Sequence, residues 1–150
     1  ASARPGTIGN ALVVNLTRCG FAGQIHPVHP QAAEIEGRKA YPRISDIPGR
    51  VDLAVIAVPA AAVEEVVRDA SRAGVHGVVV ISSGFAEASP EGRAAQARLR
   101  DFVRSSGMRM IGPNCLGLLN TDPAVSLNAT TEEQRRQTII RREVLPSGTR

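Results

Sequence analysis

The strongest constraint on the fold is a wholly apolar run, Leu53-Ala-Val-Ile-Ala-Val58, within a predicted strand at 51–58. A strand that is apolar at successive positions is buried on both faces, as the strands of a parallel sheet are. Pro59 ends the run, because proline cannot donate to a ladder of hydrogen bonds. A second apolar run at 77–81 and a further predicted strand at 108–111 indicate a parallel sheet.

Helices are predicted between these strands. Apolar residues recur at helical spacing over 7–19, and further helices are predicted at 60–73 and 90–105. Short strands are predicted at 24–28 and 125–128, and an irregular segment at 34–47 has a helical turn at 45–47. Right-handed helical crossovers satisfy this order of elements. The predicted fold is therefore α/β, a Rossmann-like doubly wound parallel sheet.

Composition limits the classes of partner. The chain has 150 residues, a formal net charge of +4 and only 3% aromatic residues. Its excess of arginine invites a nucleic-acid interpretation, but the arginines are spread along the chain and no aromatic stacking platform accompanies them. We therefore expect no nucleic-acid partner.

Cys19 and Cys115 lack metal-ligand spacing and are predicted to be reduced thiols, which are typical of the cytoplasm. No segment resembles a signal peptide, and no apolar run approaches the roughly 20 residues needed to span a membrane. We expect a cytoplasmic protein with no membrane partner. Residues 1–130 are predicted to form the domain, and 131–150 a polar basic tail that is disordered or partly helical.

Several turns of Gly, Pro and Ser lie where an α/β sheet binds ligands. The Gly-rich turn at 4–9 precedes a predicted helix and is either a phosphate loop or a plain helix start. The turn at 28–30 either holds an adenosine group or is structural. Hydroxyl and N–H groups at 82–84 suit a phosphate or carboxyl group. The tight turn at 111–117 is either a ligand loop or a structural turn.

Together, five ordered motifs resemble the CoA-binding domain of the NDP-forming acyl-CoA synthetases. That superfamily includes the succinyl-CoA synthetase alpha subunit, ADP-forming acetate–CoA ligases, and proteins in which the module is fused to a lysine acetyltransferase domain. The motifs are residues 1–9, 28–30, 51–59, 81–85 and 111–117, and the segments 118–120 and 127–130 also fit. In the family a Val-rich strand precedes the first motif, so we expect the sheet to lack its first strand.

The resemblance implies that CoA or acyl-CoA lies across the carboxyl ends of the strands. The loop that faces the CoA phosphates would consist of Gly6, Thr7, Ile8 and Gly9. Val28 and Pro30 would border the adenosine end. The pantetheine and thiol end would be lined by Val58, Pro59, Ser82, Ser83, Gly84 and Asn114.

The resemblance also limits the chemistry. The domain with the phosphorylated histidine and the ATP-grasp domain of the family are not represented in the 150 residues, so we predict no catalytic residue and no metal site here. His26, His29 and His76 are predicted to be structural. The module would act with an ATP-grasp ligase chain or with fused catalytic domains, and would be incapable of full ligase chemistry alone.

Three alternatives stay open at this point. The chain is also consistent with a regulatory or interaction module that senses acyl-CoA, or with a nonfunctional gene fragment. An NAD-binding domain would share the fold, but the sequence lacks G-x-G-x-x-G followed by a distal acidic residue.

Overall fold

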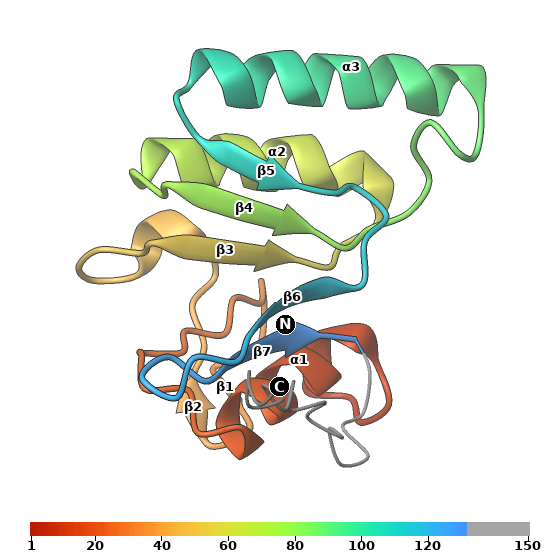
Figure 1. Ribbon diagram of the computed structural model, residues 1–150. Helices are drawn as coiled ribbons and strands as arrows, with labels where there is room; N and C mark the ends of the chain where they lie inside the picture. The colour runs from red at the N-terminus through yellow and green to blue at the C-terminus, as the bar shows by residue number, and fades with distance from the viewer. Residues whose placement is uncertain (132–150) are drawn as a thin grey trace, which may run out of the picture.

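A three-stranded parallel sheet forms the centre of the computed structural model, which describes residues 1–131 (Figure 1). Its strands are β3 (Leu53–Ile56), β4 (Gly77–Val80) and β5 (Arg109–Ile111), in the order β3-β4-β5. Gly77 lies opposite Leu53 on one side and Arg109 on the other. The predicted α/β, Rossmann-like fold is confirmed. Within the described residues, no strand pairs with the outer side of β3 or of β5.

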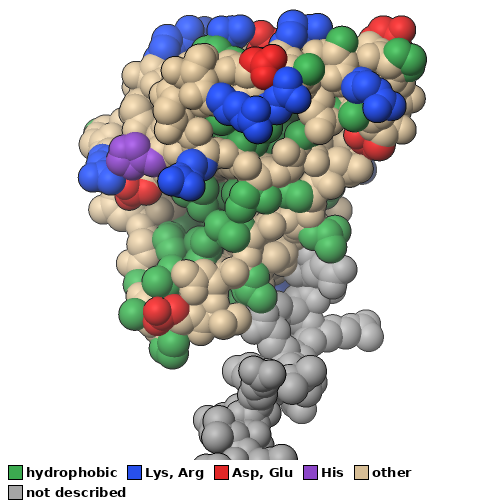
Figure 2. Space-filling model, turned by 45° about the horizontal axis from the view of Figure 1, so that its top comes forward, with side chains coloured by type: hydrophobic (Ala, Val, Ile, Leu, Met, Phe, Trp, Pro, Cys, Tyr) green, Lys and Arg blue, Asp and Glu red, His purple; other side chains and the backbone are tan. Residues whose placement is uncertain are grey.

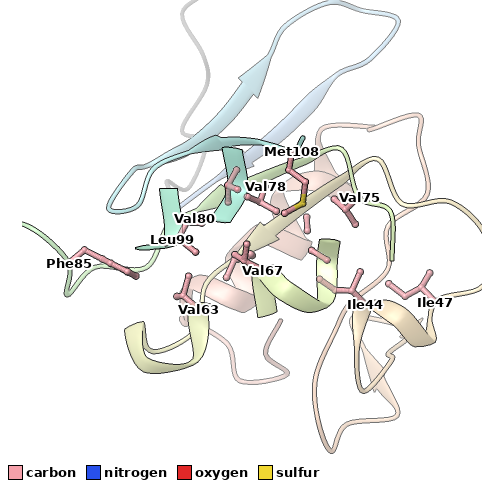
Figure 3. Close-up of a cluster of buried hydrophobic side chains, with 14 residues drawn as sticks. Ile44, Ile47, Val63, Val67, Val75, Val78, Val80, Phe85, Leu99 and Met108 are labelled. Atoms are coloured by element: carbon pink, nitrogen blue, oxygen red, sulfur yellow. The ribbon is translucent and has the colours of Figure 1, made fainter. Parts of the chain in front are cut away.

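One face of the sheet is covered by the two crossover helices, α2 (Ala60–Arg72) and α3 (Pro90–Ser105). On α2, Val63, Val67 and Ala70 recur at helical spacing and are fully buried. They pack with Val78 and Val80 of β4 in the main core (Figure 3). Each fully buried valine contributes about 1.5–3 kcal/mol to folding, so this layer is the principal source of stability.

The opposite face is covered by α1 (Ile8–Arg18) and by the antiparallel hairpin of β6 (Gly117–Asn120) and β7 (Leu127–Thr130). Leu12 of α1 and Leu118 of β6 pack with Val79 and Ile81. The Asn15 side chain donates a 3.0 Å hydrogen bond to the Thr130 carbonyl, which ties α1 to the hairpin. Because apolar elements cover both faces of the sheet, the sequences of β3 and β4 do not alternate between apolar and polar residues.

The segment predicted to be irregular at 34–47 is more ordered than expected. It forms a hairpin of β1 (Glu34–Ile35) and β2 (Arg38–Lys39), followed by the 3-10 helix η1 (Ile44–Asp46) at the predicted helical turn. Glu36 and Gly37 form the connection with positive φ angles of 51° and 70°. Such backbone suits a two-residue hairpin turn.

The strand predicted at 24–28 was wrong in extent. Only Val28 forms a bridge, parallel to Tyr41. Two hydrogen bonds support it, from the His29 N–H to the Tyr41 carbonyl at 2.9 Å and from the Tyr41 N–H to the Pro27 carbonyl at 3.0 Å. Pro27 and Pro30 lack the N–H groups that a longer ladder would need.

The other predicted elements lie within two residues of their predicted ends, whereas the strand β6 was not predicted. The strand predicted at 125–128 is β7, displaced by two residues because the Val125 and Ser126 N–H groups bond to the Asp122 carbonyl in a turn. Apart from Thr131, the predicted tail at 131–150 lies outside the described residues. No described helix is long and apolar enough to cross a membrane.

Candidate functional site

A cavity of about 300 Å³ lies at the carboxyl ends of β3 and β4. It is lined by Ile8, Ala57, Val58, Pro59, Ala60, Ile81, Ser82 and Ser83. The edge where parallel strands end is where α/β sheets bind ligands. The structure therefore brings together, from three separate stretches of sequence, the predicted site residues Ile8, Val58, Pro59, Ser82 and Ser83.

The Ser82 side chain fixes the floor of this cavity. Its Oγ accepts a hydrogen bond from the Val58 N–H at 3.1 Å and donates one to the Val58 carbonyl at 2.6 Å. Ser82 is buried, whereas the neighbouring Ser83 is exposed. The Ser82 hydroxyl is thus used in joining β3 to β4, and the Ser83 hydroxyl is the one available to a ligand.

Two helices begin at the cavity without a side-chain cap. α1 follows Thr7, whose Oγ1 donates to the Arg4 carbonyl at 2.7 Å instead of capping the helix, and α2 follows Pro59. Neither helix has an acidic residue in its first turn. By contrast, α3 is capped by Ser89, whose Oγ accepts from the Gly92 N–H at 3.0 Å. Uncapped helix starts carry a partial positive charge and attract anions.

Two glycines that lie close in sequence to cavity-lining residues have positive φ angles. Gly6, before α1, has a φ of +77°. Gly84 has a φ of +99°, and a Cβ there would lie 3.1 Å from the Ala60 Cβ. These positions suit glycine because a side chain would be strained or crowded.

The loop after β4 is held by Glu87. Its Oε1 accepts hydrogen bonds from the Gly84 N–H at 2.6 Å and the Phe85 N–H at 3.2 Å. Hydrogen bonds from backbone N–H groups, its own first and then those of Gly84 and Phe85, lower the pKa of Glu87. The carboxylate is therefore ionised at neutral pH and fixes the backbone beside Ser83.

Asn114 is tied to the cavity by its backbone. Its N–H donates to the Ser82 carbonyl at 2.9 Å, and its φ of 55° lies in the left-handed region that asparagine tolerates. The Cys115 thiol donates to the Val80 carbonyl at 3.3 Å. This cysteine holds the turn against β4 and is directed into the protein.

Val28 and Pro30 do not line the cavity. They lie in the loop where the His29 Nδ1 accepts hydrogen bonds from the Gln31 N–H at 3.1 Å and the Ala32 N–H at 2.9 Å. These bonds give His29 a part in holding the loop.

Ala57, Ala60 and Ile81 line the cavity but were missed as site residues. Alanine and isoleucine side chains have no polar or reactive group that would suggest a site. Only their position next to Val58, Pro59 and Ser82 in the sequence could have indicated that they line the cavity. Among the described residues, no group of three or more His, Cys, Asp or Glu side chains is placed to hold a metal ion.

Comparison with known proteins identifies this arrangement. Residues 1–121 match the family model described as the CoA binding domain. The chain belongs to the CoA binding domain family. Membership confirms the predicted resemblance and supports CoA or acyl-CoA as the cofactor.

This CoA binding domain matches part of several longer ligase chains. It is 46% identical over 134 residues to the alpha subunit of ADP-forming acetate–CoA ligase I from Pyrococcus furiosus, covering 87% of this chain and 29% of the relative. It is 43% identical over 122 residues to ADP-forming acetate–CoA ligase II from Archaeoglobus fulgidus, covering 81% of this chain and 18% of the relative. The chain thus spans less than a third of the length of these proteins.

A solved structure supports the same relationship. The dinucleotide-forming acetyl-coenzyme A synthetase 1 of Ca. Korarchaeum cryptofilum, determined with phosphate and ADP, superimposes with a TM-score of 0.82 at 42% identity. The match covers 89% of this CoA binding domain and 28% of that chain.

Proposed function

We propose that this CoA binding domain holds CoA or acyl-CoA for an ADP-forming acyl-CoA synthetase. The observation that carries the proposal is the cavity between the uncapped starts of α1 and α2, because it joins a positive end for phosphates to an apolar wall for a narrow chain. The loop before α1 suits the CoA phosphates, and the cavity suits the pantetheine arm.

The CoA phosphates are assigned to the loop of Gly6, Thr7, Ile8 and Gly9. This loop contains no acidic residue, and the uncapped start of α1 presents its first N–H groups there. The adenosine end is assigned to the loop that carries Val28 and Pro30.

The pantetheine arm is assigned to the cavity itself. Ile8, Val58 and Pro59 supply apolar wall, and the Ser83 hydroxyl supplies a polar group. Gly84 and Asn114 lie at the same end, since both are joined to this region through Ser82 and its loop. A volume of about 300 Å³ is at the lower end for ligand sites, which suits this arm without the nucleotide.

The resemblance implies that the ligase reaction uses a phosphorylated histidine of another domain. None of the three histidines lines the cavity. His76 precedes the first residue of β4, at the opposite end of the sheet, beside Arg50 and Asp52. We therefore propose that the described domain binds CoA and that a catalytic partner, an ATP-grasp chain or further domains, performs the chemistry. The cytoplasmic location and the domain boundary at residue 130 stay predictions.

Thermal unfolding followed by circular dichroism tests this function. Added CoA should raise the Tm, because a ligand at a hundredfold excess over its Kd stabilises the folded state by about 2.7 kcal/mol. NAD is the control and should leave the Tm unchanged. In parallel, the pure chain incubated with acetate, ATP, Mg²⁺ and CoA should form no acetyl-CoA. A Tm that does not change when CoA is added, or formation of acetyl-CoA by the chain alone, would contradict the proposal.

A further inference from the structure

A second hollow, of about 650 Å³, lies between α3 and β5. It is lined by Gln96, Arg100, Val103 and Arg104 of α3 and by Met108, Arg109, Met110, Ile111 and Gly112. We call it the α3–β5 groove. It shares no residue with the CoA cavity. Figure 2, in which α3 is turned toward the viewer, shows hydrophobic side chains reaching the surface between groups of Lys and Arg side chains.

The floor of the groove is the free edge of β5. The Arg109 N–H donates to the His76 carbonyl at 3.0 Å, so the backbone of Arg109 faces β4. Backbone groups of successive strand residues point to opposite sides, and the N–H and C=O of Met110 therefore point away from β4. Among the described strands none pairs with this edge. An open edge of this kind is a template for an added strand.

The groove is apolar in its depth and positive at its rim. Val103 and Met108 are buried, Met110 is half-buried, and Ile111 is 45% exposed. The lining has three arginines and no acidic residue. Arg100 is paired with Asp101 at 2.8 Å, whereas no described acidic residue pairs with Arg104 or Arg109.

These charges decide between the possible occupants. A second copy of the chain paired through β5 would bring two sets of these three arginines into one interface, and like charges gathered in an interface are unfavourable. A single-stranded nucleic acid would find phosphate partners, but no aromatic residue lines the groove to stack its bases. A peptide strand with carboxylates matches both the open backbone and the arginines.

We propose that the α3–β5 groove binds an acidic, extended segment of a partner protein, which adds as a strand to β5. Its backbone bonds to the N–H and C=O of Met110. Its apolar side chains pack on Met110 and Ile111, and its carboxylates reach Arg104 and Arg109. Gly112 lies at the end of the groove and begins the turn that leads to Asn114, so the bound segment would end beside the loop of the CoA cavity.

The probe is a fluorescent synthetic peptide of about ten residues in which Glu and Val alternate, a length that spans the short edge. The control peptide has Lys in place of Glu. Anisotropy titrations at low salt should show saturable binding of the acidic peptide, at least about tenfold tighter than that of the control, or about 1.4 kcal/mol. Amide exchange at Met110 should slow when the acidic peptide is bound.

Variants of the chain locate the binding. The double variant R104E/R109E should lose at least about tenfold in affinity for the acidic peptide. Arg98→Glu is the matched control, because Arg98 is exposed on the same helix and outside the groove. All variants should keep the CoA affinity of the wild type, so a failure of this proposal is distinguishable from a failure of the CoA site.

Four results would overturn the proposal. One is the absence of saturable binding by the acidic peptide, and another is an equal loss of affinity in Arg98→Glu and R104E/R109E. The third is a dimer in sedimentation that R104E/R109E strengthens. The fourth is a single-stranded oligonucleotide that binds the groove more tightly than the acidic peptide.

Discussion

The Ser82 hydroxyl exchanges two hydrogen bonds with the backbone of Val58, one accepted at 3.1 Å and one donated at 2.6 Å. This pairing continues the β3–β4 contact past the end of the ladder and shapes the cavity floor. Ser82→Ala leaves a partly buried N–H and a partly buried carbonyl of Val58 without this partner, which costs about 1–3 kcal/mol for the two bonds. Urea unfolding measures the loss.

The neighbouring Ser83→Ala is the control for this prediction. Ser83 is exposed, so its removal should change the free energy of unfolding by no more than about 0.5 kcal/mol. Equal losses in the two variants would show that the Ser82 hydroxyl does not join the strands.

Asp69 of α2 holds η1 in place. Its carboxylate accepts hydrogen bonds from the Ile44 N–H at 2.9 Å and from the Ser45 N–H and Oγ at 3.2 and 2.8 Å. Burial raises its pKa, but the hydrogen bonds from Ser45, Arg72 and Ile44 outweigh burial and lower it. Asp69→Asn should therefore lower the free energy of unfolding at pH 7 by about 1–3 kcal/mol.

The pH dependence of this loss has a definite sign. A carboxyl whose pKa is lowered by folding stabilises the protein above its unfolded pKa, about 3.9 for Asp, and loses that effect as the pH falls through the lower folded value. The difference between wild type and Asp69→Asn should be constant from pH 6 to pH 8, roughly, and shrink in acid. Glu65→Gln, exposed on the same helix, should show no such difference. A gap that persists unchanged in acid would contradict the assignment.

Gly112 approaches β4 too closely for any side chain. Its φ is +92°, and a Cβ there would lie 2.2 Å from the Val80 carbonyl oxygen. Gly112→Ala should cost more than about 3 kcal/mol, because strain and overlap add. Gly107→Ala shares the positive φ, +77°, but meets open space, so it should cost only about 1–2 kcal/mol. Similar melting temperatures for the two variants would refute the close approach.

Ile8 separates stability from ligand binding. It is the first residue of α1, is 49% exposed, and lines the cavity. Ile8→Glu places an acid at a helix start, which stabilises helices by about 0.3–1 kcal/mol. It should therefore keep or slightly raise the Tm, yet weaken CoA binding at least about tenfold, since the charge repels phosphates.

Leu119→Glu is the matched control for Ile8→Glu, because Leu119 is 45% exposed and lies outside the cavity. It should bind CoA like the wild type. Unchanged CoA affinity in Ile8→Glu would place the ligand elsewhere.

Local pattern predicted much of this structure. The apolar runs identified β3 and β4, and helical spacing identified α1, α2 and α3, because each signal lies within one element. The turns at 4–9 and 82–84 indicated a ligand at the edge where parallel strands end, and the family resemblance assigned Ile8, Val58, Pro59, Ser82 and Ser83 to that ligand.

What the sequence did not predict depends on contacts between distant segments. The hairpin β1–β2 has two residues in each strand, too few for a periodic signal. The strand β6 exists because it pairs with β7. The hydrogen bond from the Thr131 N–H to the Leu116 carbonyl, at 3.0 Å, joins the open ends of this hairpin. The α3–β5 groove exists because β5 ends the described sheet, and strand order is a property of the whole fold.

Isothermal titration of the folded chain with CoA, acetyl-CoA and NAD tests the central claim most directly. The account predicts saturable binding of CoA and acetyl-CoA near one equivalent and none of NAD, because the loop before α1 and the apolar cavity suit a phosphate group joined to a narrow arm. A folded chain that binds NAD, or that binds neither CoA nor acetyl-CoA, would contradict this claim.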